Sequence, residues 1–450
     1  MKQNTPQERY AYMTQTPIPK LIGGLAVPTI ISMLVSNIYN MADTFFVGRI
    51  STQATAAVGI VFSVMAIINA LGFFCGHGSG NFMSRRLGAG DTRQANEAAA
   101  TGFALAFILG AVLMVLGLVF LNPLCRMLGA TPTILEDAKS YLRIILLGAP
   151  FMCAELVVNN QLRFEGSAVY AMAGLVSGAV INIGLDPLFI FGFGMGVAGA
   201  ALATVLSQLI AFAILLYGSY HGPNIHIHLK NVRFNRYYML QIVNGGSPSL
   251  TRQGMQSIST ILLNTMAGAI GGDAAIAGMS VVTRVMMLAN SALIGFGQGY
   301  QPVAAFNYGA SLYKRVREGF FFCVKTGTAF LLALSALLFA YAPGIIRFFR
   351  DDPDVVDVGM RALRYQTIVF FLAAFIVMSN MMLQSIGKGV RATILASARS
   401  GLFFIPLILI LPKMLGLTGV EITQAVSDVL TFAISIPLVR SVLKEMEEAK

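Results

Sequence analysis

The sequence predicts an all-α integral membrane protein with twelve transmembrane helices arranged in two six-helix halves. Hydrophobic residues make up 56% of the 450 residues and charged residues only 11%, whereas soluble globular proteins carry about 25% charged residues. A bilayer core requires about 20 apolar residues per helix, and about twelve stretches of that length follow one another along the chain. An internal repeat relates the first six stretches to the last six.

The apolar stretches lack the ten-residue alternation of polar and apolar side chains that is typical of outer-membrane barrels, which favours helices over strands. Several are longer than a bilayer is thick, so we expect tilted spans or helices that extend beyond the membrane. The expected spans cover residues 21–47, 55–80, 98–121, 140–162, 168–192, 198–219, 238–268, 274–304, 319–346, 363–386, 393–412 and 418–440.

The repeat is visible in single residues and in short segments. Pro28 aligns with Pro248, and Gly166 aligns with Gly387. The segment ISTQATAA, which starts at Ile50, aligns in the same way with a segment of the second half. An even number of helices in each half predicts parallel repeats, related by an axis along the membrane normal.

The repeat and the polar segments divide the chain into five parts. Segments expected on one side of the membrane hold twice as many Lys and Arg residues as those expected on the other side. Because basic residues accumulate in cytoplasmic loops, both termini and the linker between the halves are predicted to be cytoplasmic. The parts are an N-terminal segment (1–20), an N-lobe (21–219), an inter-lobe linker (220–237), a C-lobe (238–440) and a C-terminal tail (441–450).

Ionisable residues inside a membrane are costly, and each is a candidate functional residue. Asp43 lies in the first span, and Asn40 and Ser36 share its helix face by their spacing. This polar stripe fits a cation site. It also fits an outer helix end in contact with water, because Gly48 and Arg49 follow closely.

A second candidate lies in the fifth span, where Asn182 precedes Asp186 by one helical turn. Pro187 removes a backbone donor and frees a carbonyl one turn back, and Thr204 of the sixth span could add a hydroxyl. Such oxygen ligands suit Na⁺ or a shared proton. The alternative is that Asp186 caps or repairs a helix kink.

The second half differs from the first at these positions. Asp43 aligns with Leu263, Asn182 with about Gly401 and Asp186 with about Ile405. This asymmetry predicts that the first half alone holds a carboxylate ion site, with no metal other than Na⁺ at Asp43, Asn182 and Asp186.

Other charges lie within the second-half spans. Arg284 and Asp428 are expected to lie deep enough to pair with each other, either as a structural ion pair or as a substrate contact, whereas Arg252, Lys325 and Arg399 are expected to reach the inner surface. Glu155 is a further buried acid, in the fourth span.

Several signals point away from an enzyme. The four cysteines are isolated, which excludes a Cys-x-x-Cys metal knuckle. No phosphate-binding loop, His-Glu-x-x-His or Gly-x-Ser-x-Gly motif is present. His226 and His228 lie in the polar linker, where loop residues are favoured over a metal pair. We expect no cofactor and no nucleic-acid partner, despite the net charge of +11.

The sequence resembles the multidrug and toxic compound extrusion (MATE) family over residues 20–440. The resemblance is carried by four segments that are specific when taken together. They are Asn40-Met-Ala-Asp43-Thr-Phe-Phe-Val-Gly48-Arg49, Asn182-Ile-Gly-Leu-Asp186-Pro187-Leu-Phe-Ile-Phe-Gly192, Gly196-Val-Ala-Gly199-Ala-Ala-Leu-Ala-Thr204, and Gly297-Gln298-Gly299-Tyr-Gln301-Pro302 with Asn307-Tyr-Gly309-Ala310.

The resemblance implies two lobes around a central cleft and secondary active export of organic cations or amphipathic drugs in exchange for H⁺ or Na⁺. In the bacterial DinF-like branch the coupling residues map onto four positions, which are Asp43, Asn182, Asp186 and Thr204. The family's helix-bending proline matches Pro28. Another branch carries a seventh-helix Glu where this chain has Gln256, which argues against a second-lobe carboxylate site of that kind.

We therefore expect a multidrug antiporter that works by alternating access as a monomer in a bacterial cytoplasmic membrane, with small amphipathic molecules and lipid as partners. Flexible Met side chains suit a promiscuous pocket. The candidate pocket residues are Asn40, Gln256, Met255, Met286 and Arg284. The alternative within transport is a lipid or lipid-linked oligosaccharide flippase, favoured by the in-span arginines. A channel would move solutes without a counter-ion.

Overall fold

The computed structural model describes residues 5–221 and 225–448. The predicted N-terminal segment, linker and tail each include a few residues outside these ranges. The helices of the first half are α1 (Pro6–Gln15), α2 (Ile18–Gly48), α3 (Thr52–Gly88), α4 (Thr92–Val119), α5 (Leu121–Met127), α6 (Leu135–Phe164), α7 (Ala168–Pro187), η1 (Leu188–Gly192) and α8 (Gly196–Tyr220).

The linker contains one short helical turn, η2 (Leu229–Asn231). The second half then follows. Its helices are α9 (Arg236–Gly309), α10 (Tyr313–Ala340), α11 (Ala342–Phe349), α12 (Pro353–Val369), α13 (Leu372–Ser385), α14 (Gly389–Ser397), η3 (Ala398–Leu402), α15 (Phe404–Leu415) and α16 (Leu417–Glu448).

The all-helical membrane fold predicted from the sequence is confirmed. Ten helical segments of the described chain are long and apolar enough to cross a membrane, and α12 with α13 forms an eleventh across a bend of 60°. The 74-residue α9 is broken at Gly272, where the backbone has φ 65° and ψ −157°. Only glycine adopts this region readily. Counting α9 as two spans gives twelve, and the break lies between the predicted seventh and eighth spans.

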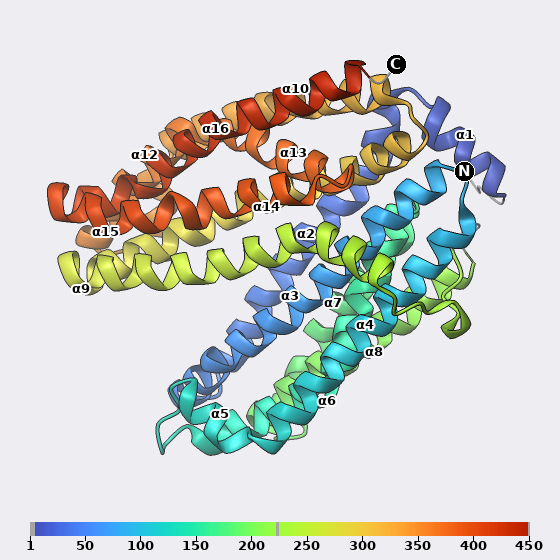
Figure 1. Cartoon of the computed structure of the whole chain (residues 1–450). Helices are drawn as coiled ribbons and strands as arrows, with labels where there is room; N and C mark the ends of the chain where they lie inside the picture. The colour runs from blue at the N-terminus through green and yellow to red at the C-terminus, as the bar shows by residue number, and fades with distance from the viewer. Residues whose placement is uncertain (1–4, 222–224, 449–450) are drawn as a thin grey trace.

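The two halves form two arms that meet at one end and diverge toward the other (Figure 1). Both chain termini lie at the end where the arms meet, which we call the closed end. The turn of α9 and the short α5 lie at the opposite, open end (Figure 1). One buried apolar cluster fills the second half and includes the first-half residues nearest the closed end, whereas a second, large cluster and a third, small one lie in the rest of the first half. The arms therefore share a core only at the closed end.

Glycines allow α3 and α9 to cross in direct backbone contact at the closed end. A Cβ atom on Gly88 would overlap the backbone oxygen of Phe306, and a Cβ atom on Gly309 would overlap the backbone oxygen of Arg85. Gly88 and Gly309 are equivalent positions of the repeat, so the contact is reciprocal. Small residues at helix crossings let backbones approach closely in lipid, where dispersion contacts replace the hydrophobic effect.

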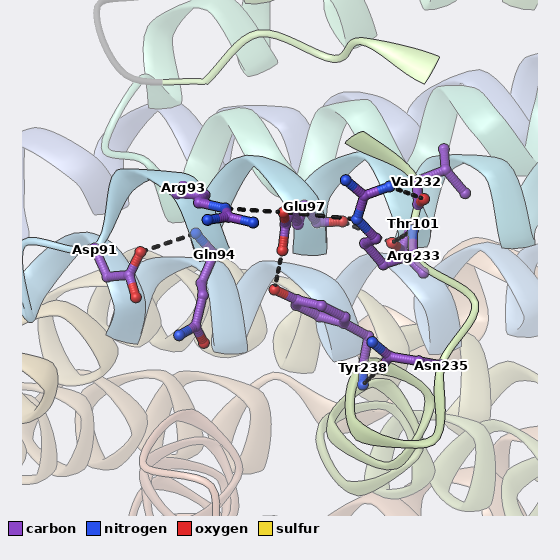
Figure 2. A network of polar contacts seen from close by, with 9 residues as sticks. All are labelled: Asp91, Arg93, Gln94, Glu97, Thr101, Val232, Arg233, Asn235 and Tyr238. Carbon is purple, nitrogen blue, oxygen red and sulfur yellow. Dashed lines mark hydrogen bonds and ion pairs between the residues drawn. The ribbon is translucent and has the colours of Figure 1, made fainter. Parts of the chain in front are cut away.

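The linker is held against the first half by the carboxylate of Glu97 on α4 (Figure 2). Glu97 accepts a hydrogen bond of 2.5 Å from the Tyr238 hydroxyl of α9 and forms ion pairs with Arg93 at 3.3 Å and Arg233 at 3.7 Å. The Arg233 N–H donates to the Thr101 hydroxyl at 2.9 Å. These contacts join α4, the linker and the start of α9 on the closed side of the molecule.

The short helix α1 bridges both halves at the closed end. The Arg9 guanidinium donates to the backbone oxygen of Glu165 at 3.0 Å and to the Ser167 hydroxyl at 2.6 Å, both in the turn before α7. On the other side, the Asn307 amide of α9 donates to the backbone oxygen of Met13 at 3.1 Å. Burial raises the pKa of the Glu165 carboxyl to about 7, with Arg9 opposing the shift. The contact persists when that carboxyl is protonated, because Arg9 binds the backbone oxygen and the hydroxyl.

Candidate functional site

The interior of the first half holds a cluster of acidic and polar side chains from α2, α7 and α8. Asp43 is 5% exposed, Asp186 and Asn182 are fully buried, and Thr204 is 1% exposed. The Asn182 amide lies 3.5 Å from the Thr204 hydroxyl. With its amide group turned over, Asn182 donates to Asp186 Oδ2 at 3.1 Å and accepts from the Thr204 N–H at 3.3 Å. The structure thus brings Asn182, Asp186 and Thr204 into contact.

Asp43 belongs to the same cluster because its carboxylate interacts electrostatically with that of Asp186. In each of these two carboxylates, Oδ1 is inaccessible to solvent and has no hydrogen-bond partner among the described residues. A buried polar atom without a partner costs free energy. Two such oxygens within one buried cluster are suited to hold a proton or to bind a cation.

The backbone around Asp186 is irregular. Pro187 ends α7 and lacks the N–H that would otherwise bond a carbonyl one turn earlier. The chain continues as a π-helical turn, η1, which closes with a hydrogen bond of 2.9 Å from the Phe193 N–H to the Leu188 oxygen. Such turns are frequent at functional sites. The sequence signal of an Asp-Pro pair within a span therefore corresponds to a real break in the helix.

Three residues of this site were missed by the sequence analysis. Tyr39 lies one turn before Asp43 and interacts with Gln208 of α8. Tyr141 of α6 interacts with Thr204. The spacing could have indicated two of the three, since Tyr39 and Asp43 are four residues apart on α2, as are Thr204 and Gln208 on α8.

Glu155 of α6 is a third buried acid in the first half, at 5% exposure, and its charge also acts on Tyr39. None of the three acids forms an ion pair with a basic residue in the described part of the chain. Isolated buried carboxylates are unstable in their charged form. The site therefore requires either protons or a bound cation. No group of three or more His, Cys, Asp or Glu side chains is arranged to hold a metal within the described residues.

The second half has a different polar centre, and here two expectations are wrong. Asp428 pairs with Arg399 of η3 and not with Arg284. The guanidinium donates to both carboxylate oxygens, at 2.8 and 3.1 Å, and Gln424 donates to Oδ1 at 2.8 Å. Arg399 consequently does not extend to the inner surface, because a buried charge is held where its partner lies.

The pocket candidates occupy different environments. Arg284 is exposed and lies on the α9 face that also carries Ser291, which accepts a hydrogen bond of 2.6 Å from Asn37 of α2. This spacing places Arg284 on the side of α9 facing the first half, nearer the open end. Asn40 is half-buried, one turn from Asn37 along α2.

The other three pocket candidates face the second half itself. Gln256 is exposed but accepts a hydrogen bond of 3.2 Å from Ser400. Met255 packs against Gly401, and Met286 is 7% exposed within the second-half core. Pro28 lies inside α2, between the residues that contact Gly295 and Gly299 of α9.

Comparisons with known proteins agree with this architecture. The chain is 27% identical over 415 residues to the multidrug export protein MepA of Staphylococcus haemolyticus. The aligned region covers 92% of this chain and 91% of that protein. It is similar to a crystal structure of MATE in complex with MaL6, with a TM-score of 0.92, 28% identity, and 98% and 99% of the two chains covered. An outward-facing structure of a multidrug resistance MATE family transporter also gives a TM-score of 0.92, at 29% identity over 97% and 98% of the two chains.

The family model described as MatE matches the chain twice, over residues 28–188 and 248–410. The two matches begin at Pro28 and Pro248, the prolines that the internal repeat aligns, and they cover most of each half. One family model thus matches the chain twice, once in each half. The chain belongs to the MatE family of membrane transporters.

Proposed function

We propose that this transporter exports cationic or amphipathic drug-like compounds in exchange for H⁺ or Na⁺, by alternating access. The coupling cation binds in the first half, at Asp43, Asn182, Asp186 and Thr204. The single observation that carries this proposal is a pair of buried carboxylate oxygens, one on Asp43 and one on Asp186, that have no hydrogen-bond partner within residues 5–221 and 225–448. The names of the MepA relative and of the MATE structures support drugs as the substrate class.

The physics of the site supports coupling. Charged carboxylates are stable in contact with water and unstable when dehydrated, unless a proton or cation neutralises them. The site therefore releases its cation when water reaches it and retains the cation when the surrounding helices close. Binding of a cation from the open end and of substrate from the closed end would then alternate. The bending role of Pro28 that the family resemblance implies fits its position between two contacts with α9.

The orientation follows from charge. The proposal places both termini, the linker and hence the closed end in the cytoplasm of a bacterial cell, because basic side chains are enriched there. The end at which the two arms diverge then faces the outside, and the similarity to an outward-facing MATE structure supports this assignment. The DinF-like branch is proposed on the same four coupling residues.

A flippase function is less well supported by the side chains. A flippase for anionic lipid-linked substrates needs several free basic groups along its path. Arg399 is neutralised by Asp428, and Arg252 approaches the Asn380 amide oxygen at 3.5 Å. Of the three in-span arginines that favoured this alternative, only Arg284 is exposed.

The experiment that tests the function measures drug efflux from loaded proteoliposomes, separately under a pH gradient and under a Na⁺ gradient. Efflux that follows one of the gradients identifies the coupling ion. Equal efflux with no gradient of either ion would contradict the proposal.

Cysteine labelling tests the orientation. A single cysteine introduced at Lys230 or Asn235 in the linker should resist a membrane-impermeant thiol reagent in intact cells and react after the cells are opened. The four native cysteines are buried, which keeps the background low. If the introduced cysteine reacts in intact cells that express the variant at the wild-type level, the proposed orientation is wrong and the linker faces the outside.

The asymmetry between the halves predicts unequal effects of two similar truncations. Asn182→Ala removes an amide that contacts Asp186 and Thr204, and we expect the dependence of efflux on the cation gradient to fall severalfold. Gln256→Ala should leave that dependence intact, because no carboxylate lies beside it among the described contacts. The measurement is the initial efflux rate at several gradient sizes. Equal loss of coupling in both variants would count against a first-half site.

A further inference from the structure

A chain of six buried polar residues crosses the interface between the two halves near the closed end. The Arg163 guanidinium of α6 donates to Gln298 Oε1 of α9 at 2.5 Å and lies 3.5 Å from His77 Nε2 of α3. The other His77 ring nitrogen lies 2.7 Å from the Ser249 hydroxyl of α9. Gln384 of α13 donates to the same hydroxyl at 2.9 Å and accepts from Gln301 at 3.2 Å.

These residues are no more than 4% exposed, so the chain is a sealed part of the interface. Two of its links join the halves directly, between Arg163 and Gln298 and between His77 and Ser249. His77 is related to Gln298, and Arg163 to Gln384, by the offset that relates Gly166 to Gly387. The network therefore surrounds the axis about which the two halves repeat.

The network contains a positive charge that no negative side chain within the described ranges balances. Arg163 keeps its positive charge in proteins, and it forms no ion pair with any carboxylate in the described residues. Its Nε is buried and finds no hydrogen-bond partner in the described part of the chain. A second cation, Arg252 of α9, acts electrostatically on His77 from nearby. An unpaired buried charge costs stability, so a purely structural network would be better built from neutral amides, as Gln384 shows at the equivalent position.

The location suggests what the charge does. His77 lies eleven residues before the closed end of α3, which is about 16 Å along the helix axis. Asp43 lies near the opposite end of α2, five residues before Gly48. A cation that moved from the acidic cluster to the closed end along the interface between the halves would pass the guanidinium, where a low dielectric strengthens repulsion. Fixed positive charges exclude cations from membrane pores in this way.

We propose that Arg163 is the residue that keeps the closed end impermeable to coupling cations. In the closed arrangement, His77, Ser249 and Gln298 hold the guanidinium on the path between the acidic cluster and the cytoplasm. The cation then crosses only when the halves move, which is the condition for exchange without leak. This inference concerns leak and goes beyond the proposed coupling site. It uses that site only to define which ion would escape.

The test measures passive H⁺ and Na⁺ entry into drug-free proteoliposomes with internal fluorescent indicators. For Arg163→Gln we expect the leak to rise about tenfold or more, because a full charge is removed from a low-dielectric path. Arg163→Lys keeps the charge and should stay as tight as wild type. The double variant Arg163→Gln/Gln298→Lys places a positive charge at the same interface from the opposite half, and its leak should return to the wild-type level.

Three results would overturn the proposal. One is an Arg163→Gln variant as tight as wild type. Another is equal leak in all three Arg163 variants, which would show that packing and not charge makes the seal. The third uses Gln298→Glu, which serves if Arg163→Gln does not fold. This variant keeps Arg163 in place but neutralises its charge by pairing, so it should also leak. A Gln298→Glu protein as tight as wild type would refute the role of charge. Drug efflux measured on the same vesicles reports separately on the coupling site.

Discussion

Asp43→Asn and Asp186→Asn should each leave a folded protein whose gradient-driven drug efflux falls to background. Asn is isosteric with a protonated Asp and removes the charge that a cation must neutralise. Both carboxylates are buried in the first half, and no basic side chain of the described residues compensates them. The variants should therefore mimic a permanently occupied site, so substrate can bind while the exchange cycle stops.

The measurement is efflux by each purified variant in vesicles beside wild type, with folding checked by monodispersity. The matched control is Asp273→Asn, which makes the same chemical change at an exposed acid beside the turn of α9. Coupled efflux near the wild-type rate in both variants would show that the coupling ion binds elsewhere. Glu155 would then be the next candidate, because the other deep acid, Asp428, is already paired with Arg399.

Gly88→Ala or Gly309→Ala should prevent the closed end from closing. A single methyl group at either position overlaps a backbone oxygen of the opposite half, and neither backbone can move without separating α3 from α9. Overpacking of this kind costs about 1–3 kcal/mol or more. It outweighs the gain of about 0.5–1 kcal/mol that Ala normally brings to a helix interior. We expect loss of efflux and a population shifted away from the closed arrangement.

Distances between spin labels placed on α3 and α9 at the closed end would detect that shift. Two controls lie on the same helices, Gly59→Ala on α3 and Gly254→Ala on α9, because a Cβ atom at either position meets nothing within 4 Å. They should transport like wild type and be equally or more stable. If Gly88→Ala and Gly309→Ala behaved like these controls, the backbone contact would not be required for the transport cycle.

The parts of this protein that follow from local sequence were predictable. The length of the apolar stretches set the spans, since each must cross a bilayer of fixed thickness. The alignment of Pro28 with Pro248 predicted that the chain consists of two related halves. Polar residues within membrane spans are costly, so the few that occur are candidate functional residues. This reasoning predicted Asp43, Asn182, Asp186 and Thr204, and the structure places all four in the interior of the first half.

The parts that depend on how helices rotate and pack were not predictable. Arg399 and Asp428 are far apart in sequence, and their pairing depends on the π-helical turn η3 and on the approach of α16. Nothing in the sequence distinguishes Arg163 from the other basic residues near span ends, and His77 belongs to no motif. Their roles appear only when α3, α6 and α9 meet at the closed end.

The most direct test of the account reverses the usual experiment. Proteoliposomes are given a drug gradient alone, with no pH or Na⁺ gradient, and the movement of H⁺ and Na⁺ is recorded. Because coupling between two ligands is reciprocal, wild-type protein should drive one of these cations against the direction of drug flow, and Asp43→Asn and Asp186→Asn should not. Drug that flows at the wild-type rate without any counter-cation would contradict exchange through the first-half site and would indicate a channel.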